Sequence, residues 1–157
     1  MFVFLSYPHA DNDEFQDVSD FARGLRQEIV MRISPSFVYQ AGEGGPVVGN
    51  LRDALRSKLR QADVYMPLLA PAFFASHWCT HEFQMYKEEK KLQNQPLKIA
   101  PVLWLPFDAL AFARGNNMLE IADAAYFDWA THRLTGHKSP ESRLALSHFV
   151  DSLCEVF

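Results

Sequence analysis

Trp78 and Glu82 are the two side chains of this sequence best suited to act together on a ligand, because they lie four positions apart in a stretch with helical periodicity. Residues four apart share one face of a helix. The apolar stripe of the same helix, predicted over residues 76–92, consists of Cys79, Phe83 and Tyr86. We expect Trp78 and Glu82 to face away from this stripe, where an aromatic plate beside a carboxylate suits a ligand with a flat ring and sugar hydroxyls.

The segments that follow the predicted strands carry the other candidates. In doubly wound sheets, ligands bind beyond the carboxyl ends of the strands, at the switch point between the first and third strands. The first strand is followed by polar and aromatic residues, the third by an aromatic residue and the helix that bears Glu82, and the fourth by an acid. The predicted substrate-binding residues are Ser6, Tyr7, His9, Asp11, Phe74, Trp78 and Asp108.

Each candidate also has a structural explanation that the sequence leaves open. Glu82 could be a solvated helix carboxylate, and Trp78 could be only an anchor in the core. Asp11 with Glu14 three residues later matches a capping box at the start of a helix. Turn or capping hydrogen bonds would explain Ser6, His9 and Asp108. We assign the catalytic role, if the chain has one, to Glu82.

Short apolar runs and helical periodicity alternate along the chain. The runs predict strands at residues 2–5, 37–39, 64–69 and 99–104, with a short fifth strand at 125–127. Apolar residues at steps of three and four predict helices over 15–33, 50–59, 76–92 and 139–156. The second and last helices are predicted to turn inward Leu51, Leu55, Leu59, Leu146, Phe149, Leu153 and Val156. Alternating strands and helices predict an α/β fold, a flavodoxin-like parallel sheet of about five strands flanked by helices.

Two prolines fall inside predicted strands. Pro67 lies in the third strand and Pro101 in the fourth. Proline cannot donate a hydrogen bond to a strand ladder, so it is usually confined to sheet edges or bulges. We therefore expect a bulge or an edge position at both sites.

Composition excludes several classes of function. A length of 157 residues and a formal net charge of -4 favour a single domain over residues 1–157, without a broad surface for nucleic acid or anionic membranes. Cys79 and Cys154 lack the spacing of a metal site or a disulfide framework, so we expect no metal and a reducing, cytoplasmic location. The glycines at 42, 44 and 45 lack the Lys-Ser/Thr pair that completes a P-loop.

Four runs of residues resemble Toll/interleukin-1 receptor (TIR) domains in order and spacing. They are FLSY at 4–7 with His9 and Asp11, LAP at 69–71 with Phe73 and Phe74, SHWCTHE at 76–82, and PVLW at 101–104. The Trp-Cys-x-x-Glu run is the most specific of them. Pro8 and the pair Met66 and Pro67 depart from the family pattern.

The resemblance implies a function for the Glu82 region. Enzymatic members of the family cleave NAD to nicotinamide and linear or cyclic ADP-ribose through a glutamate in this run, which implies that Glu82 is catalytic, that NAD is the substrate and that no cofactor is needed. It also implies self-association with other TIR domains and a sensor domain in the same or a partner chain, since such domains are effector modules of immune proteins. Other members are adaptors that only assemble, chiefly through the loop after the second strand, here residues 40–49. A phosphoacceptor receiver is disfavoured because the first strand lacks its acidic pair.

Overall fold

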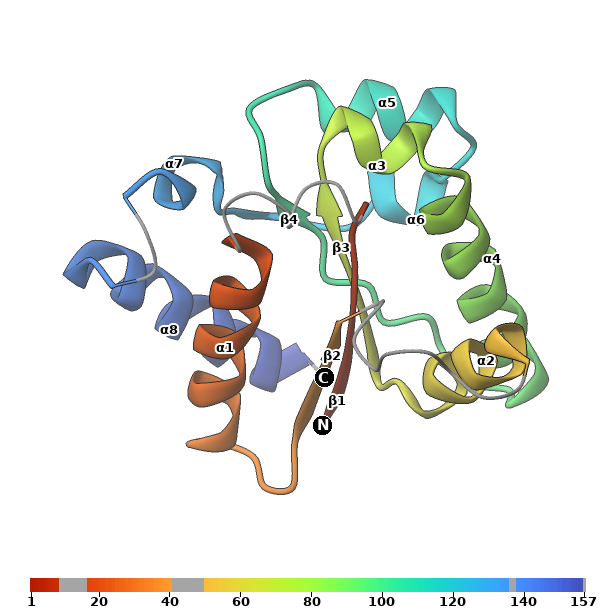
Figure 1. Cartoon of the computed structure of the whole chain (residues 1–157), viewed down its shortest axis with the longest axis horizontal. Coiled ribbons are helices and arrows are strands. Elements are labelled where there is room, and N and C mark those ends of the chain that lie inside the picture. Colours follow the sequence, from red (N-terminus) through yellow and green to blue (C-terminus); the bar gives the residue numbers. More distant parts are fainter. Residues whose placement is uncertain (9–16, 41–49, 136–137, 157) are drawn as a thin grey trace.

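A five-stranded parallel sheet forms the centre of the computed structural model, which describes residues 1–8, 17–40, 50–135 and 138–156. The strands follow one another across the sheet in the order β2-β1-β3-β4-β5 (Figure 1). Their bounds are Phe2–Ser6 for β1, Phe37–Gln40 for β2, Val64–Leu69 for β3, Val102–Leu103 for β4 and Phe127–Asp128 for β5. Every pairing is parallel. The predicted flavodoxin-like topology is therefore confirmed, with the switch point between β1 and β3.

Helices cover both faces of the sheet (Figure 1). One layer holds α1 (Asp17–Val30) and α8 (Pro140–Val156), with the short α7 (Ala130–Arg133) beside them. The other layer holds α2 (Leu51–Gln61), α3 (Pro71–Ala75), α4 (His77–Leu92), α5 (Ala109–Gly115) and α6 (Leu119–Ala122). None of the helices in the described residues is both long and apolar enough to cross a membrane.

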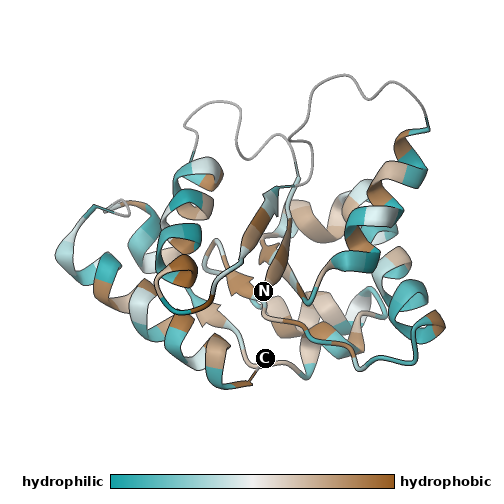
Figure 2. Cartoon of the chain, turned by 90° about the horizontal axis from the view of Figure 1, so that it is seen from below, coloured by the Kyte–Doolittle hydropathy of each residue, from teal (hydrophilic) through white to brown (hydrophobic). Residues whose placement is uncertain are grey.

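The sheet is buried on both faces, as the unbroken apolar runs predict. Phe4 belongs to the core cluster under α2 and α4, whereas Val3 and Leu5 belong to the cluster under α1 and α8. All three are 0% exposed, and burying each such side chain contributes roughly 1.5–3 kcal/mol. Figure 2 shows hydrophobic colour on the central strands and hydrophilic colour mainly on the outer sides of the helices.

Side chains cap the helices at the predicted places. Asn50 accepts a hydrogen bond of 3.1 Å from the Arg52 amide at the start of α2. Ser139 accepts one of 3.1 Å from the Ser142 amide in the first turn of α8. Such caps satisfy amides that have no partner within the helix, and each typically contributes about 1 kcal/mol. These polar residues therefore mark where α2 and α8 begin.

The expectation for the two prolines is wrong. Pro67 lies in the central strand β3, in register with Ser6 of β1, and not at an edge. No bulge forms either, because the bridge between Tyr65 and Ile99 and the later pairing of Leu68 with Val102 keep the same register. The β3–β4 ladder instead lapses between these pairs. Pro67 and Pro101 have no backbone N–H to donate to this ladder. Pro101 lies directly before β4, which is only two residues long.

Other boundaries also differ from the predictions. The first helix ends at Val30 rather than at residue 33, and β5 occupies Phe127–Asp128 rather than 125–127. Leu51 and Val156, predicted to face inward, are 53% and 70% exposed. Val150 is buried in α8 although it was not among the predicted inward residues. The helices α3, α5, α6 and α7 were not predicted, because their short segments do not complete enough turns to show a period.

Candidate functional site

The helix α4 carries the predicted catalytic residue, and its first turn is fixed by a side-chain cap. Ser76 accepts a hydrogen bond of 3.2 Å from the Cys79 amide. Cys79, Phe83 and Tyr86 face the core as predicted, each 0% exposed. Glu82 is also 0% exposed, so the expectation that it lies on a face turned away from the core is wrong. This burial also excludes the alternative of a solvated carboxylate. The buried face of α4 is wider than its apolar stripe and includes Glu82.

Ser6 is the direct partner of Glu82. Side chains alternate along a strand, so Ser6 faces α4 together with Phe4, two residues before it. The Ser6 hydroxyl donates a hydrogen bond of 2.5 Å to Oε2 of Glu82. This bond joins the carboxyl end of β1 to α4, at the edge of the sheet where the topology predicts ligand binding. The structure therefore brings together two of the predicted site residues.

Burial controls the charge of this carboxyl. Removal from water disfavours the ionised form of an acid, and burial raises the pKa of Glu82 to about 8. The Ser6 hydrogen bond and the nearby Trp78 side chain act in the opposite direction and lower that pKa, by less than burial raises it. At pH 7 the carboxyl is therefore mainly protonated in this structure.

One oxygen of the Glu82 carboxyl has an unmet need for a hydrogen bond. Neither Trp78 nor any other residue in the described part of the chain completes a hydrogen bond to the buried Oε1 atom. Buried polar atoms are nearly always hydrogen-bonded, so such an exception calls for an explanation. A hydroxyl of a bound ligand could supply the missing donor.

Tyr65 also belongs to this polar cluster, although it is not one of the predicted site residues. It lies on β3, its hydroxyl is buried, and that hydroxyl has no partner among residues 1–8, 17–40, 50–135 and 138–156. Burial raises the pKa of Tyr65 well above its ordinary value, and the neighbouring charge of Glu82 adds to this shift. The phenol is therefore a neutral donor close to the carboxyl. Its signal in the sequence is a tyrosine inside an otherwise apolar strand.

Trp78 occupies an intermediate position. Its side chain is half-buried and packs against the core cluster that contains Phe83. Its ring centroid lies 6.5 Å from that of His81. One part of the indole is therefore a core contact while another remains accessible, so anchoring and ring stacking are compatible roles.

Three predicted substrate-binding residues lie in other surroundings. Tyr7 packs in the core cluster on the opposite face of the sheet from Glu82. Phe74 is buried, and its ring centroid lies 6.1 Å from that of Phe107 in an aromatic group between α3 and α5. Asp108 is exposed and caps α5, accepting a hydrogen bond of 3.0 Å from the Ala111 amide. Structural roles thus account for the observed contacts of these three side chains.

The remaining predictions for this region concern segments that the structure leaves undescribed. His9 and Asp11 lie outside the described residues, and so do residues 41–49 of the glycine-rich loop. Within the described residues, no group of three or more His, Cys, Asp or Glu could hold a metal ion.

Comparison with known proteins identifies the family of the chain. The model of the family described as TIR domain matches residues 3–138. This match covers β1 through the segment that precedes α8, including both Ser6 and Glu82. A search of curated proteins finds no match.

Proposed function

Because the chain belongs to the TIR domain family, we propose that it is an NAD glycohydrolase that cleaves the bond between nicotinamide and ribose. The products are nicotinamide and ADP-ribose in linear or cyclic form. In this proposal the chain is a cytoplasmic effector module of a longer sensing or immune protein. Self-assembly raises its activity.

The observation that carries this proposal is the buried carboxyl of Glu82, with one oxygen bonded to Ser6 and the other without a partner in the described residues. Nicotinamide leaves NAD as a neutral ring, so cleavage needs no general acid, unlike glycoside hydrolysis by two carboxylates. The ribose that remains has oxocarbenium character. A carboxylate held in place beside it stabilises this charge electrostatically, and the free oxygen can accept a hydrogen bond from a ribose hydroxyl.

The charge state of Glu82 fits an enzyme that rests in a weakly active form. With a pKa of about 8, the carboxyl is mainly neutral at pH 7. A bound pyridinium or the developing oxocarbenium favours the ionised form, because a nearby positive charge lowers the pKa of an acid. Since Glu82 is 0% exposed, the ligand can reach it only after a local rearrangement. Packing against a neighbouring copy could stabilise that rearranged state.

The direct test is to incubate the purified protein with NAD and to separate the products by chromatography. We expect nicotinamide and an ADP-ribose product to appear together, most clearly at high protein concentration or after fusion to an oligomeric carrier. The carrier alone with NAD is the control. No nicotinamide above that control, even from the clustered protein, would contradict the proposal.

The alternative function is a non-enzymatic TIR-type assembly domain. The full burial of Glu82 and its bond to Ser6 favour this reading, since a carboxyl with those contacts could serve only to join β1 to α4. An assembly domain would associate in a size-exclusion experiment and leave NAD intact. The two functions are therefore separated by nicotinamide release, not by self-association.

A further inference from the structure

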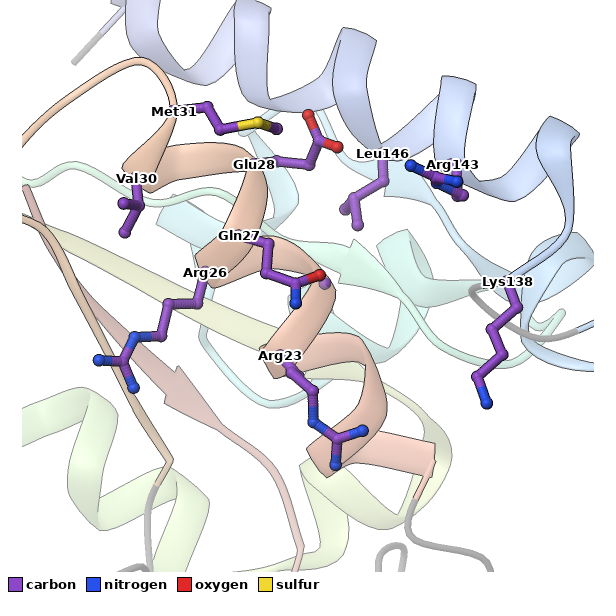
Figure 3. A pocket seen from close by; sticks show the side chains of 10 residues that line it. Arg23, Arg26, Gln27, Glu28, Val30, Met31, Lys138, Arg143 and Leu146 are labelled. Carbon is purple, nitrogen blue, oxygen red and sulfur yellow. The ribbon is translucent and has the colours of Figure 1, made fainter.

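A groove between α1 and α8 lies in the helical layer on the other side of the sheet from Glu82 (Figures 1 and 3). Its volume is about 830 Å³, within the range of roughly 300–1,000 Å³ that is typical of small-molecule sites. Residues from both helices line it, and none of them belongs to the Glu82 cluster. The groove is therefore separate from the site proposed for NAD.

The floor of the groove is apolar. At Gly24 the two helices approach so closely that an added Cβ would lie 3.1 Å from the Leu146 side chain. Val30 and Met31 lie at one end, 47% and 70% exposed. Exposed apolar side chains beside a concave surface offer a favourable contact for the apolar body of a ligand.

The rim of the groove is basic although the chain is acidic overall, with a formal net charge of -4. Figure 3 shows Arg23 on α1 and Lys138 before α8 at the same end, with Arg143 on the side of α8 that faces α1. Arg26 points away from α8 and contributes less. Lys138 and Arg143 form no ion pair with any described residue, while Arg23 has only an exposed pair with Asp20. These cations remain available to an incoming anion.

The single acid in the lining does not cancel this charge. Glu28 is held by Arg32, whose guanidinium lies 2.7 Å from the carboxylate. The N-terminal end of α8 adds a partial positive charge near Lys138, because the peptide dipoles of a helix align along its axis. The end of the groove at Lys138 and Arg143 is therefore the positive end, and the end at Met31 is apolar.

We propose that this groove binds a small organic anion: an aromatic or aliphatic body that carries a phosphate, sulfate or carboxylate group. The anionic group lies between Lys138 and Arg143, and the body lies over Leu146 toward Met31. Charge complementarity argues for an anion, and the apolar floor argues against an inorganic ion alone.

Two dyes with the same ring system test this proposal on the whole chain. Anilinonaphthalenesulfonate carries a sulfonate, whereas phenylnaphthylamine is its uncharged counterpart. In a fluorescence titration at low salt, we expect the sulfonate dye to bind the parent chain more tightly than the neutral dye does. The double variant Lys138→Gln with Arg143→Gln should weaken its binding about two- to thirtyfold, since each of the two exposed charge contacts is worth about 0.2–1 kcal/mol. Binding of the neutral dye should not change.

Arg114→Gln is the matched control, because Arg114 is an exposed arginine on α5, outside the groove. Thermal melts of all the variants should coincide with that of the parent chain. The proposal is overturned if the sulfonate dye does not bind the parent, if both dyes bind it equally, or if the double variant binds the sulfonate dye as the parent does. The proposal is also overturned if Arg114→Gln weakens binding of the sulfonate dye as much as the double variant does.

Discussion

The hydroxyl of Ser6 donates a 2.5 Å hydrogen bond to Oε2 of Glu82, across 76 positions of the sequence. The bond is buried, and it links the end of a central strand to the helix that follows the next strand in the sheet. A buried polar atom that loses its hydrogen-bond partner costs free energy, so the carboxyl is held in the orientation that keeps this bond. This contact therefore fixes the direction of the carboxyl on which the proposed reaction depends.

Removing the Ser6 hydroxyl should affect both stability and activity. Ser6→Ala leaves Oε2 of Glu82 without its donor in a buried site, which typically costs about 1–3 kcal/mol. The pKa of Glu82 should rise further, because the Ser6 hydrogen bond lowers it. We expect Ser6→Ala to have a lower melting temperature. NAD cleavage by the parent chain should increase with pH as Glu82 ionises, and in Ser6→Ala this increase should occur at higher pH.

Ser36→Ala is the control for that change. The Ser36 side chain is also buried, yet its hydroxyl bonds no described residue. Its removal should cost less stability and leave the pH dependence of cleavage unchanged. Equal losses of stability in the two variants would show that the bond between Ser6 and Glu82 contributes little.

The raised pKa of Glu82 predicts how stability depends on pH. The pKa is about 8 in the folded chain and about 4.5 as the ordinary value. Between these values the folded state holds a proton that the unfolded state releases, so stability falls as pH rises through this range. The contribution is fully present below about pH 4.5 and is lost above about pH 8. The melting temperature, measured from pH 5 to 8.5, should fall more steeply with rising pH for the parent chain than for Glu82→Gln. Glu155→Gln, at an exposed position of α8, should decline like the parent.

Trp78 should contribute more to NAD cleavage than to stability. Since its side chain is only half-buried, Trp78→Ala should cost less than the roughly 3–5 kcal/mol typical of a fully buried tryptophan. Trp129, which is 2% exposed in the core under α1 and α8, supplies the comparison. We expect Trp129→Ala to melt far lower, and Trp78→Ala to melt moderately lower while losing NAD cleavage. If the Trp78 variant is as unstable as the Trp129 variant, ring stacking loses its support.

The sequence predicts the order of the sheet because strands and helices alternate along the chain. The apolar runs of β1 and β3 also identify these strands as buried on both faces. It also predicts helix starts at residues 50, 76 and 139, since short polar side chains before helical periodicity favour the N-terminus of a helix. The bounds of β4 and β5 were harder to predict. Each strand has two residues, and its length is set by where the neighbouring strand offers partners.

The candidate site was predicted less completely, for a physical reason. A glutamate within a helix usually faces water, so the pattern around Glu82 gave no sign of its burial. Its contact with Ser6 depends on tertiary packing between distant segments. Tyr7 was predicted near Glu82 because it directly follows Ser6 at the end of β1. Side chains alternate along a strand, so Tyr7 lies on the face of the sheet opposite to Glu82.

Specific activity should rise with protein concentration. Glu82 is buried in this structure, so an active arrangement must differ from it, and contacts between copies could favour that arrangement. We expect nicotinamide release per molecule to increase from dilute solution to crowded or tethered protein, in parallel with association measured by light scattering. A constant specific activity over the whole concentration range would rule out activation by self-assembly.

Replacement of Glu82 itself is the sharpest test of the proposed reaction. Glu82→Gln keeps the shape of the side chain and lets Ser6 retain an oxygen acceptor, but it removes the negative charge. Loss of a preorganised electrostatic stabiliser typically lowers the rate about 10²- to 10³-fold. Stability should not fall, because the carboxyl is mainly neutral in the folded chain at pH 7. Glu89→Gln is the matched control, since Glu89 is a second buried carboxylate on α4, 3.2 Å from Arg56. That control should lose stability with its ion pair and retain cleavage per folded molecule. If Glu82→Gln folds like the parent and still releases nicotinamide within about tenfold of the parental rate, Glu82 is not the catalytic carboxylate.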